Sequence, residues 1–143
     1  MNPVKKFFSN IDKKKLLFSI VKFNDIVDER INISPDEEFM QSSVSKLKKG
    51  YVARAHKHTH YERKVFVTQE SWVILKGKVQ AKMYDIDDKQ IYECTLETGD
   101  IFTNYYGGHS LMVEEDAIFC EFKNGPFFGN TKDKVYIDWC YKK

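Results

Sequence analysis

The sequence His56-Lys57-His58-Thr59-His60 contains three of the four histidines of this 143-residue chain. In a β-strand, successive side chains point to opposite sides, so the three imidazoles would leave a strand here from one face. Imidazole nitrogens combined with a carboxylate suit a first-row divalent metal. Glu70 and the fourth histidine, His109, therefore join this stretch as candidates for one site, and the rest of the chain reads as its scaffold.

Short extended segments separated by turn signals surround this stretch. Alternating apolar and polar residues, as in 79–84, indicate half-buried strands, and a spacing of this kind is typical of an all-β sandwich or barrel. Residues 1–15 are rich in lysine and are expected to form an irregular arm or a short helix. The expected strands are 16–27, 39–47, 51–60, 68–75, 79–84, 90–96, 101–103, 110–113, 117–123 and 135–139.

Size and composition exclude several classes of protein. The length suits one domain, and a net charge of +2 lacks the basic character of a nucleic-acid binder. Three cysteines without a close pair argue against disulfides and favour a reducing, cytoplasmic location. The apolar run 16–21 is too short for a signal peptide or a membrane span, so no membrane is expected as a partner. The balanced charge likewise makes a nucleic acid an unexpected partner.

The first histidine stretch carries a resemblance to a known family. Gly50, His56-x-His58, Glu70 and Gly77 resemble the first motif of the cupin superfamily. The gap between His58 and Glu70 is longer than the usual gap. Glu62 suits the usual gap better, but no glycine follows it at the expected distance, whereas Gly77 follows Glu70 with the spacing of the family.

The second cupin motif has a counterpart further along the chain. Gly99-Asp100 and Gly107-Gly108-His109 are similar to it, although Tyr105 replaces the proline and the spacing is one residue short. The resemblance covers approximately residues 39–123. It implies a double-stranded β-helix, the jelly-roll barrel of cupins, over residues 39–143, with an N-terminal arm and first strand in 1–38 packed on it.

The resemblance also implies a ligand set. His56, His58, Glu70 and His109 would hold one divalent metal ion (Fe, Mn, Zn or Ni) and leave coordination positions for water or substrate. In the alternative interpretation the histidines are ordinary polar residues of a metal-free cupin.

Further residues are candidates for catalysis and for substrate binding, each with a plainer alternative. His60, Tyr84 and Tyr106 are candidate catalytic residues, but His60 also fits a surface position. Arg54, Trp72 and Tyr105 are candidate substrate contacts, although Arg54 would equally pair with a carboxylate. Each tyrosine also fits a role in the core or an interface.

A weaker resemblance concerns the substrate. Residues 68–70, 121–128 and 133–134 are similar to small cupins from bacterial surface-polysaccharide gene clusters. This resemblance implies an isomerase or epimerase acting on a sugar-like or nucleotide-sugar intermediate, and pairing of sheet edges into a homodimer. Two alternatives stay open, namely an Fe(II)-dependent dioxygenase of a small polar molecule and a non-catalytic ligand-binding cupin.

Overall fold

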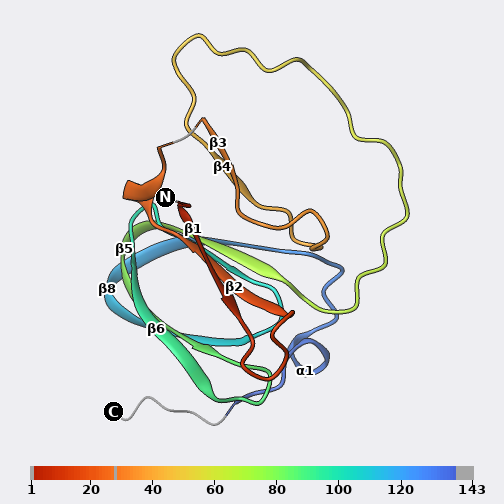
Figure 1. Ribbon diagram of the computed structural model, residues 1–143, viewed down its shortest axis with the longest axis vertical. Coiled ribbons are helices and arrows are strands. Elements are labelled where there is room, and N and C mark those ends of the chain that lie inside the picture. The colour runs from red at the N-terminus through yellow and green to blue at the C-terminus, as the bar shows by residue number, and fades with distance from the viewer. Residues whose placement is uncertain (1, 28, 138–143) are drawn as a thin grey trace.

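The structure is a computed structural model that describes residues 2–27 and 29–137. These residues form antiparallel β-structure with very little helix (Figure 1). The elements are β1 (Val4–Phe8), β2 (Leu16–Val21), the 3-10 turn η1 (Phe23–Asp25), β3 (Arg30–Asn32), β4 (Ser43–Ser45), β5 (Glu70–Tyr84), β6 (Gln90–Glu97), β7 (Ile101–Asn104), β8 (Gly108–Lys123) and α1 (Asn130–Asp133). The expected all-β class is confirmed.

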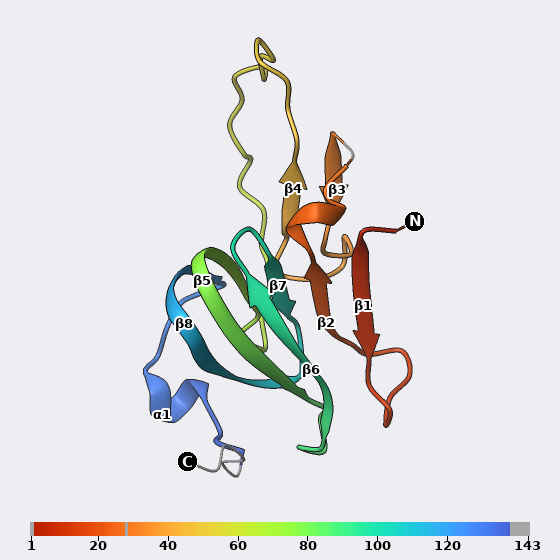
Figure 2. The same ribbon diagram turned by 90° about the vertical axis from the view of Figure 1, so that its left-hand side faces the viewer.

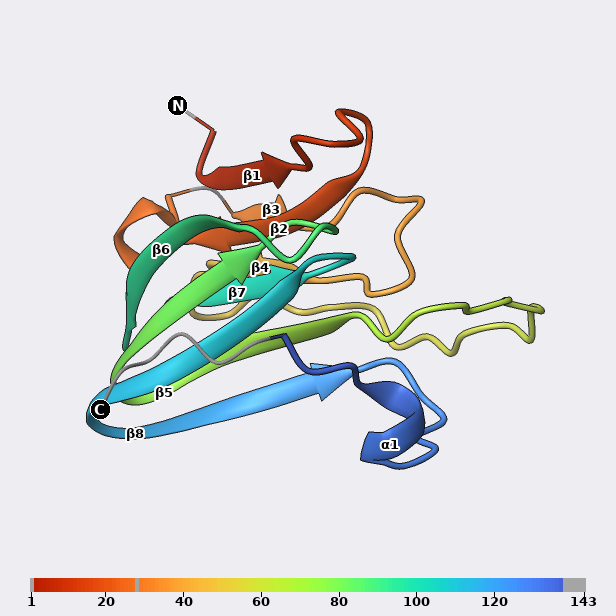
Figure 3. The same ribbon diagram turned by 90° about the horizontal axis from the view of Figure 1, so that it is seen from below.

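The two long strands β5 and β8 run side by side and double back together (Figure 3). Residues 70–73 of β5 pair with β7 and with the end of β8, whereas residues 78–84 pair with β6 and the beginning of β8. The register shifts between 74 and 79, where Gly77 adopts a φ of +81°. This corner folds one half of the main sheet over the other.

The main sheet has the order β1-β2-β7-β5-β6, with β8 pairing on β5, and β3 and β4 form a separate hairpin. Within the described residues the strands do not close into a barrel. No helix in this part of the chain is long and apolar enough to cross a membrane.

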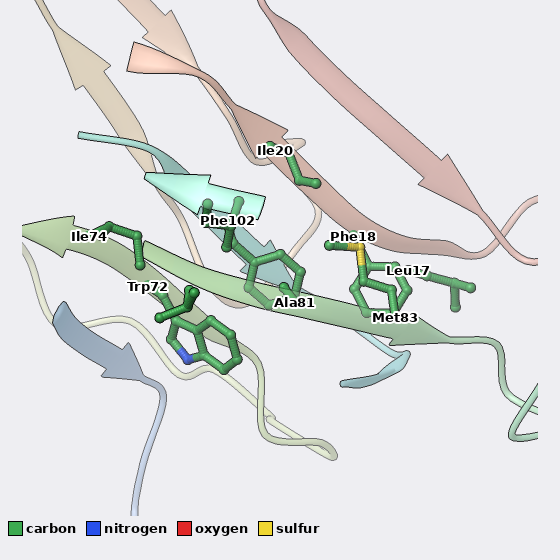
Figure 4. Close-up of a cluster of buried hydrophobic side chains, with 10 residues drawn as sticks. Leu17, Phe18, Ile20, Trp72, Ile74, Ala81, Met83 and Phe102 are labelled. Atoms are coloured by element: carbon green, nitrogen blue, oxygen red, sulfur yellow. The ribbon is translucent and has the colours of Figure 1, made fainter. Parts of the chain in front are cut away.

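The main core lies between the folded halves of the sheet (Figure 4). Its side chains come from β2, β5, β6 and β7, and the fully buried ones include Phe18, Val79, Met83 and Phe102. A second cluster, which includes Val21 and Ile31, joins the other face of β2 to the β3–β4 hairpin. All six residues of β2 are buried because the strand is covered on both faces.

Several expected boundaries are wrong, and pairing explains why. The expected strands 68–75 and 79–84 belong to one strand, β5. Residues 114–116, expected as a turn, continue β8. The reason is that β5 and β8 bend together and pair again on both sides of the bend. Residues 4–8, expected in an irregular arm, form β1 and pair with β2. The expected strand 39–47 shortens to Ser43–Ser45.

The expected strand at 51–60 is also wrong. Residues 46–69 contain no strand, and every side chain from Lys46 to Phe66 is exposed. Figures 1 and 2 show this connection as a wide arc that leaves β4 and returns to β5. An isolated extended segment has no neighbour for its backbone hydrogen bonds, so alternation alone does not make it a strand. Residues 135–137 form no strand either, and the rest of the expected strand 135–139 lies outside the described residues.

Candidate functional site

Glu70 and His109 meet although 39 positions separate them in the sequence. Glu70 is the first residue of β5 and His109 is the second of β8. His109 lies in register with Met83, at the far end of β5, so only the doubling back of both strands brings it to Glu70. The His109 Nε2 and Glu70 Oε1 atoms are 2.7 Å apart, which is ion-pair distance when the imidazole is protonated.

Aromatic rings hold the imidazole of His109 in place. The ring of Trp72 lies edge-on to it at a centroid distance of 5.0 Å, and the ring of Phe102 is 6.0 Å away. Trp72 is only 3% exposed and Phe102 is fully buried, so both are part of the rigid core. The Glu70–His109 pair is therefore supported by strands and core side chains and does not lie on a loop.

The carboxyl group of Glu70 is almost entirely removed from water, with 8% of its side chain exposed. Burial by itself raises the pKa of Glu70. The contact with His109 and the positive charges of His109, Lys134 and Lys123 outweigh burial, so the pKa lies below its ordinary value. Glu70 is therefore held as a carboxylate that faces an imidazole.

The pair opens into a pocket of about 420 Å³. Its walls come from the end of the 46–69 connection, from β5, β7 and β8, and from the segment after α1. The residues that line it are Val67, Thr68, Glu70, Tyr84, Asn104, Gly107, Gly108, His109, Ser110, Leu111, Asp133, Lys134, Val135, Tyr136 and Ile137. Its volume falls in the range of small-molecule sites.

Buried polar atoms without partners occur around the pair. Within the described residues, the Nδ1 atom of His109 and the Oδ1 atom of Asn104 are shielded from solvent and accept or donate no hydrogen bond. Asn104 is the register partner of Glu70, so both side chains leave the sheet on the same face. A buried polar atom without a partner is unfavourable unless a ligand or water satisfies it. These atoms therefore favour a polar ligand.

The segment that follows β8 covers one side of the pocket. The Thr68 hydroxyl donates a hydrogen bond of 2.6 Å to the carboxylate of Asp133 in α1. The backbone N–H of Gln69 donates to the Asn124 side chain at 2.6 Å. The beginning of β5 and the segment 124–133 are thus joined next to the Glu70–His109 pair.

The aromatic candidates divide between the pocket and the interior. Tyr84 lines the pocket, and its hydroxyl lies 3.3 Å from that of Ser110. Tyr105 is fully buried and donates to the Ser34 hydroxyl at 3.1 Å, so it belongs to the core. Tyr106 lies outside the pocket, with the Lys15 ammonium 5.4 Å from its ring centroid. Trp72 supports His109 from within the core.

The candidates in the 46–69 connection do not join the pocket. His56, His58, His60 and Arg54 are all exposed, and the Nδ1 atom of His56 lies 3.0 Å from the carbonyl oxygen of Arg54. Among residues 2–27 and 29–137, no group of three or more His, Cys, Asp or Glu side chains is placed to hold a metal ion. Glu70 and His109 supply two donors together, so the four expected ligands as placed do not fit a metal centre.

The structure adds pocket residues that the sequence patterns did not single out. Asn104 is the last residue of β7, whose four residues are all buried. A polar side chain at the end of a buried strand could have indicated a pocket residue from the sequence. Thr68 and the pair Asp133–Lys134 enter the sequence analysis only through the resemblance to polysaccharide-cluster cupins. Their place beside Glu70 depends on contacts across more than 60 positions.

The comparisons with known proteins identify no relative. No family model, no curated protein and no solved structure matches the chain. The link to cupins therefore rests on the sequence motifs alone, and it is a proposal.

Proposed function

We propose that this chain is a small cupin-type enzyme that moves a proton on a sugar-like molecule, in the manner of an isomerase or epimerase. The observation that carries the proposal is the 2.7 Å contact between Glu70 and His109 at the wall of a 420 Å³ pocket. A carboxylate that orients an imidazole and stabilises its protonated form makes that imidazole an effective general base. His109 is the proposed base, and Glu70 is its orienting partner.

Proton transfer by His109 needs a ring nitrogen that is free to exchange a proton with a ligand. Nε2 faces Glu70, whereas Nδ1 has no partner among the described residues but is shielded from solvent, so the proposal requires the ring to turn towards the ligand. In the proposed reaction, one ring nitrogen takes a proton from a carbon next to a carbonyl group and later returns it. The neighbouring carboxylate stabilises the positive charge that the ring carries in between.

The polar groups of the pocket suit a molecule with several hydroxyl groups. The side chains of Tyr84 and Ser110 supply hydroxyls, and Asn104 supplies an unpartnered acceptor. Leu111 and Val135 add apolar surface for the ring carbons of a sugar. This mixture supports a carbohydrate ligand, and a role in surface-polysaccharide biosynthesis follows from the sequence resemblance.

The finer description of the fold belongs to the same proposal. We infer that the doubled-back β5 and β8 are the central strands of a cupin jelly roll. Support comes from the position of Glu70 in the first cupin motif and of His109 in the second. Assembly into a homodimer through a sheet edge also stays a prediction.

Hydrogen exchange in D₂O tests the proposed reaction directly. Phosphorylated and nucleotide-linked keto sugars are incubated with the protein, and deuterium incorporation is followed by mass spectrometry. We expect incorporation with the wild type, none with His109→Gln, and a rate reduced by about 100-fold with Glu70→Gln. Glu114→Gln, an exposed carboxylate on the same strand as His109, is the matched control. Equal exchange in the wild type and His109→Gln would contradict the proposal.

A divalent ion is a separate proposal, and no step above depends on it. It requires the 46–69 connection to close on the pocket, so that His56 and His58 join Glu70 and His109. One observation supports such closure: Val67 and Thr68, near the end of the connection, line the pocket. The rings of His56 and His58 lie 5.4 Å apart, so the two imidazoles would arrive together. The ion would act as a Lewis acid towards the substrate.

A further inference from the structure

Lys134 is a cation of the pocket wall that makes no direct contact with a carboxylate of residues 2–27 and 29–137, although its charge acts on Glu70 from a distance. It follows α1 directly and lines the pocket together with Glu70 and His109. In the described part of the chain its ammonium group forms neither a salt bridge nor a hydrogen bond. The other lysine near the pair, Lys123, contacts Glu121 at 3.1 Å. Of these two lysines, Lys134 is the one whose ammonium group has no direct anionic contact in the described part of the chain.

The carboxylates that line the pocket already have partners of their own. Glu70 contacts His109 at 2.7 Å, and Asp133 accepts the hydrogen bond of Thr68 at 2.6 Å. Neither contact involves the Lys134 ammonium directly, which acts on Glu70 only through its charge. An ammonium group with three donors at the wall of a pocket is best satisfied by a phosphate or carboxylate of the ligand.

The connection that leads into the pocket carries a second, independent positive charge. Between Lys46 and Lys64 the chain has seven lysine and arginine residues and one glutamate, whereas the whole chain has a net charge of only +2. All residues of this stretch are exposed, and its continuation at Val67 and Thr68 lines the pocket. Positive charge on an arm beside a pocket raises the local concentration of anions and their association rate.

We propose that the pocket binds an anionic ligand, with Lys134 contacting its phosphate or carboxylate and the residues 46–64 steering it to the mouth. The inference rests on the proposed function and names its substrate class as a sugar that bears one of these groups. Uncharged sugars are expected to bind more weakly, because they form no ion pair with Lys134.

Binding to the full chain is measured by calorimetry with three probes, namely glucose 1-phosphate, glucuronate and glucose. We expect at least one of the two anions to bind at least tenfold more tightly than glucose, and the comparison of the two identifies the preferred group. Lys134→Gln should weaken binding of that anion by about tenfold, since a hydrogen-bonded ion pair is lost. Lys132→Gln, two positions away and exposed, is the matched control and should bind like the wild type.

The steering role has its own measurement. The double variant Arg54→Glu, Lys57→Glu should slow association of the anion several-fold in stopped-flow experiments and leave its dissociation rate unchanged. Glucose binding equal to that of both anions, no saturable binding of either anion, or an unchanged affinity in Lys134→Gln would overturn the inference. Unchanged association in the double variant would overturn the steering part.

These results are distinguishable from a failure of the proposed reaction. His109→Gln should abolish deuterium exchange and still bind the anion, because Lys134 remains. Anion binding that depends on Lys134, without exchange in the wild type, would support the inference and contradict the proposed proton transfer.

Discussion

The Cα atom of Gly77 lies directly against the backbone of Asp116, so closely that a Cβ atom at Gly77 would overlap the Asp116 carbonyl oxygen. This contact is the corner at which β5 and β8 double back together. Neither Gly77 nor Asp116 lines the pocket, yet their contact determines whether Glu70 reaches His109. Backbone geometry at a glycine thus controls the assembly of the site.

Replacement of Gly77 by alanine should therefore destabilise the whole fold. The residue has a φ of +81°, and an added methyl group would also meet the backbone of β8. We expect the free energy of unfolding to fall by about 3 kcal/mol or more in urea titrations. Gly50→Ala is the control, since its φ of +91° is similar and nothing lies within 4 Å of an added Cβ. Gly50→Ala should lower the free energy of unfolding by only about 1 kcal/mol. An equal decrease in both variants would contradict the proposed role of the contact between Gly77 and Asp116.

The Glu70–His109 pair predicts a particular dependence of stability on pH. Glu70→Gln should lower the free energy of unfolding by about 2 kcal/mol at pH 6, because a charged hydrogen-bond partner is lost. The pKa of Glu70 is lower in the folded chain than its ordinary value of 4.5, so acid favours unfolding. The stabilisation by the Glu70 carboxylate is complete above the pKa that Glu70 has in the unfolded chain. It disappears as the pH falls through the lower pKa that Glu70 has in the folded chain.

Urea unfolding of the wild type and Glu70→Gln between pH 6 and pH 3 measures this effect. The difference between the two proteins should persist down to about pH 4.5 and shrink below it. Glu114→Gln, on an exposed face, should differ little from the wild type throughout. A difference that grows in acid would show that Glu70 is not held as a carboxylate.

Asp100 of the second motif is expected to be a structural residue. Its carboxylate accepts the backbone N–H groups of Phe23 at 3.0 Å and Glu97 at 2.9 Å, and it contacts the Lys22 ammonium at 2.5 Å. Only 5% of its side chain is exposed. Asp100→Ala should cost about 3 kcal/mol in urea unfolding, because several donors lose a charged acceptor together. Asp87→Ala, which breaks an exposed ion pair with Lys89 in the β5–β6 turn, should cost less than about 1 kcal/mol.

Metal analysis of untagged protein tests the proposed divalent ion. If the 46–69 connection closes on the pocket, wild-type protein should retain close to one equivalent of Fe, Mn, Zn or Ni after gel filtration. The double variant His56→Ala, His58→Ala and the single variant His109→Gln should each lose it, whereas Lys57→Ala should keep it. Protein that never retains a divalent ion, even after incubation with each of the four, would refute the metal proposal and leave the Glu70–His109 proposal standing.

The elements that could be predicted from the sequence are those with a local signal. Strand β6 was expected at 90–96 and ends at Glu97, and β7 was expected at 101–103 and ends at Asn104. Turn residues flank both strands, and both pair with β5, which precedes them in the chain. The expected break between strands 68–75 and 79–84 is half correct, since the chain does bend at Gly77, but the strand continues through it.

The candidate site was only partly predictable for the same reason. Glu70 and His109 were expected to meet, and the structure brings them together. His56 and His58 were expected on a strand, but no neighbouring strand pairs with them. Asn104 and Lys134 reach the pocket through contacts that no local pattern records.

By itself, the sequence determined the period-two patterns, the turn residues and the spacing of the two histidine-bearing motifs. Tertiary structure alone decided which segments pair, where β5 and β8 bend, and which polar groups share a pocket. The physical reason lies in the nature of β-structure. The hydrogen bonds of a strand are made to another part of the chain, so alternation specifies which faces are buried but leaves the partner open.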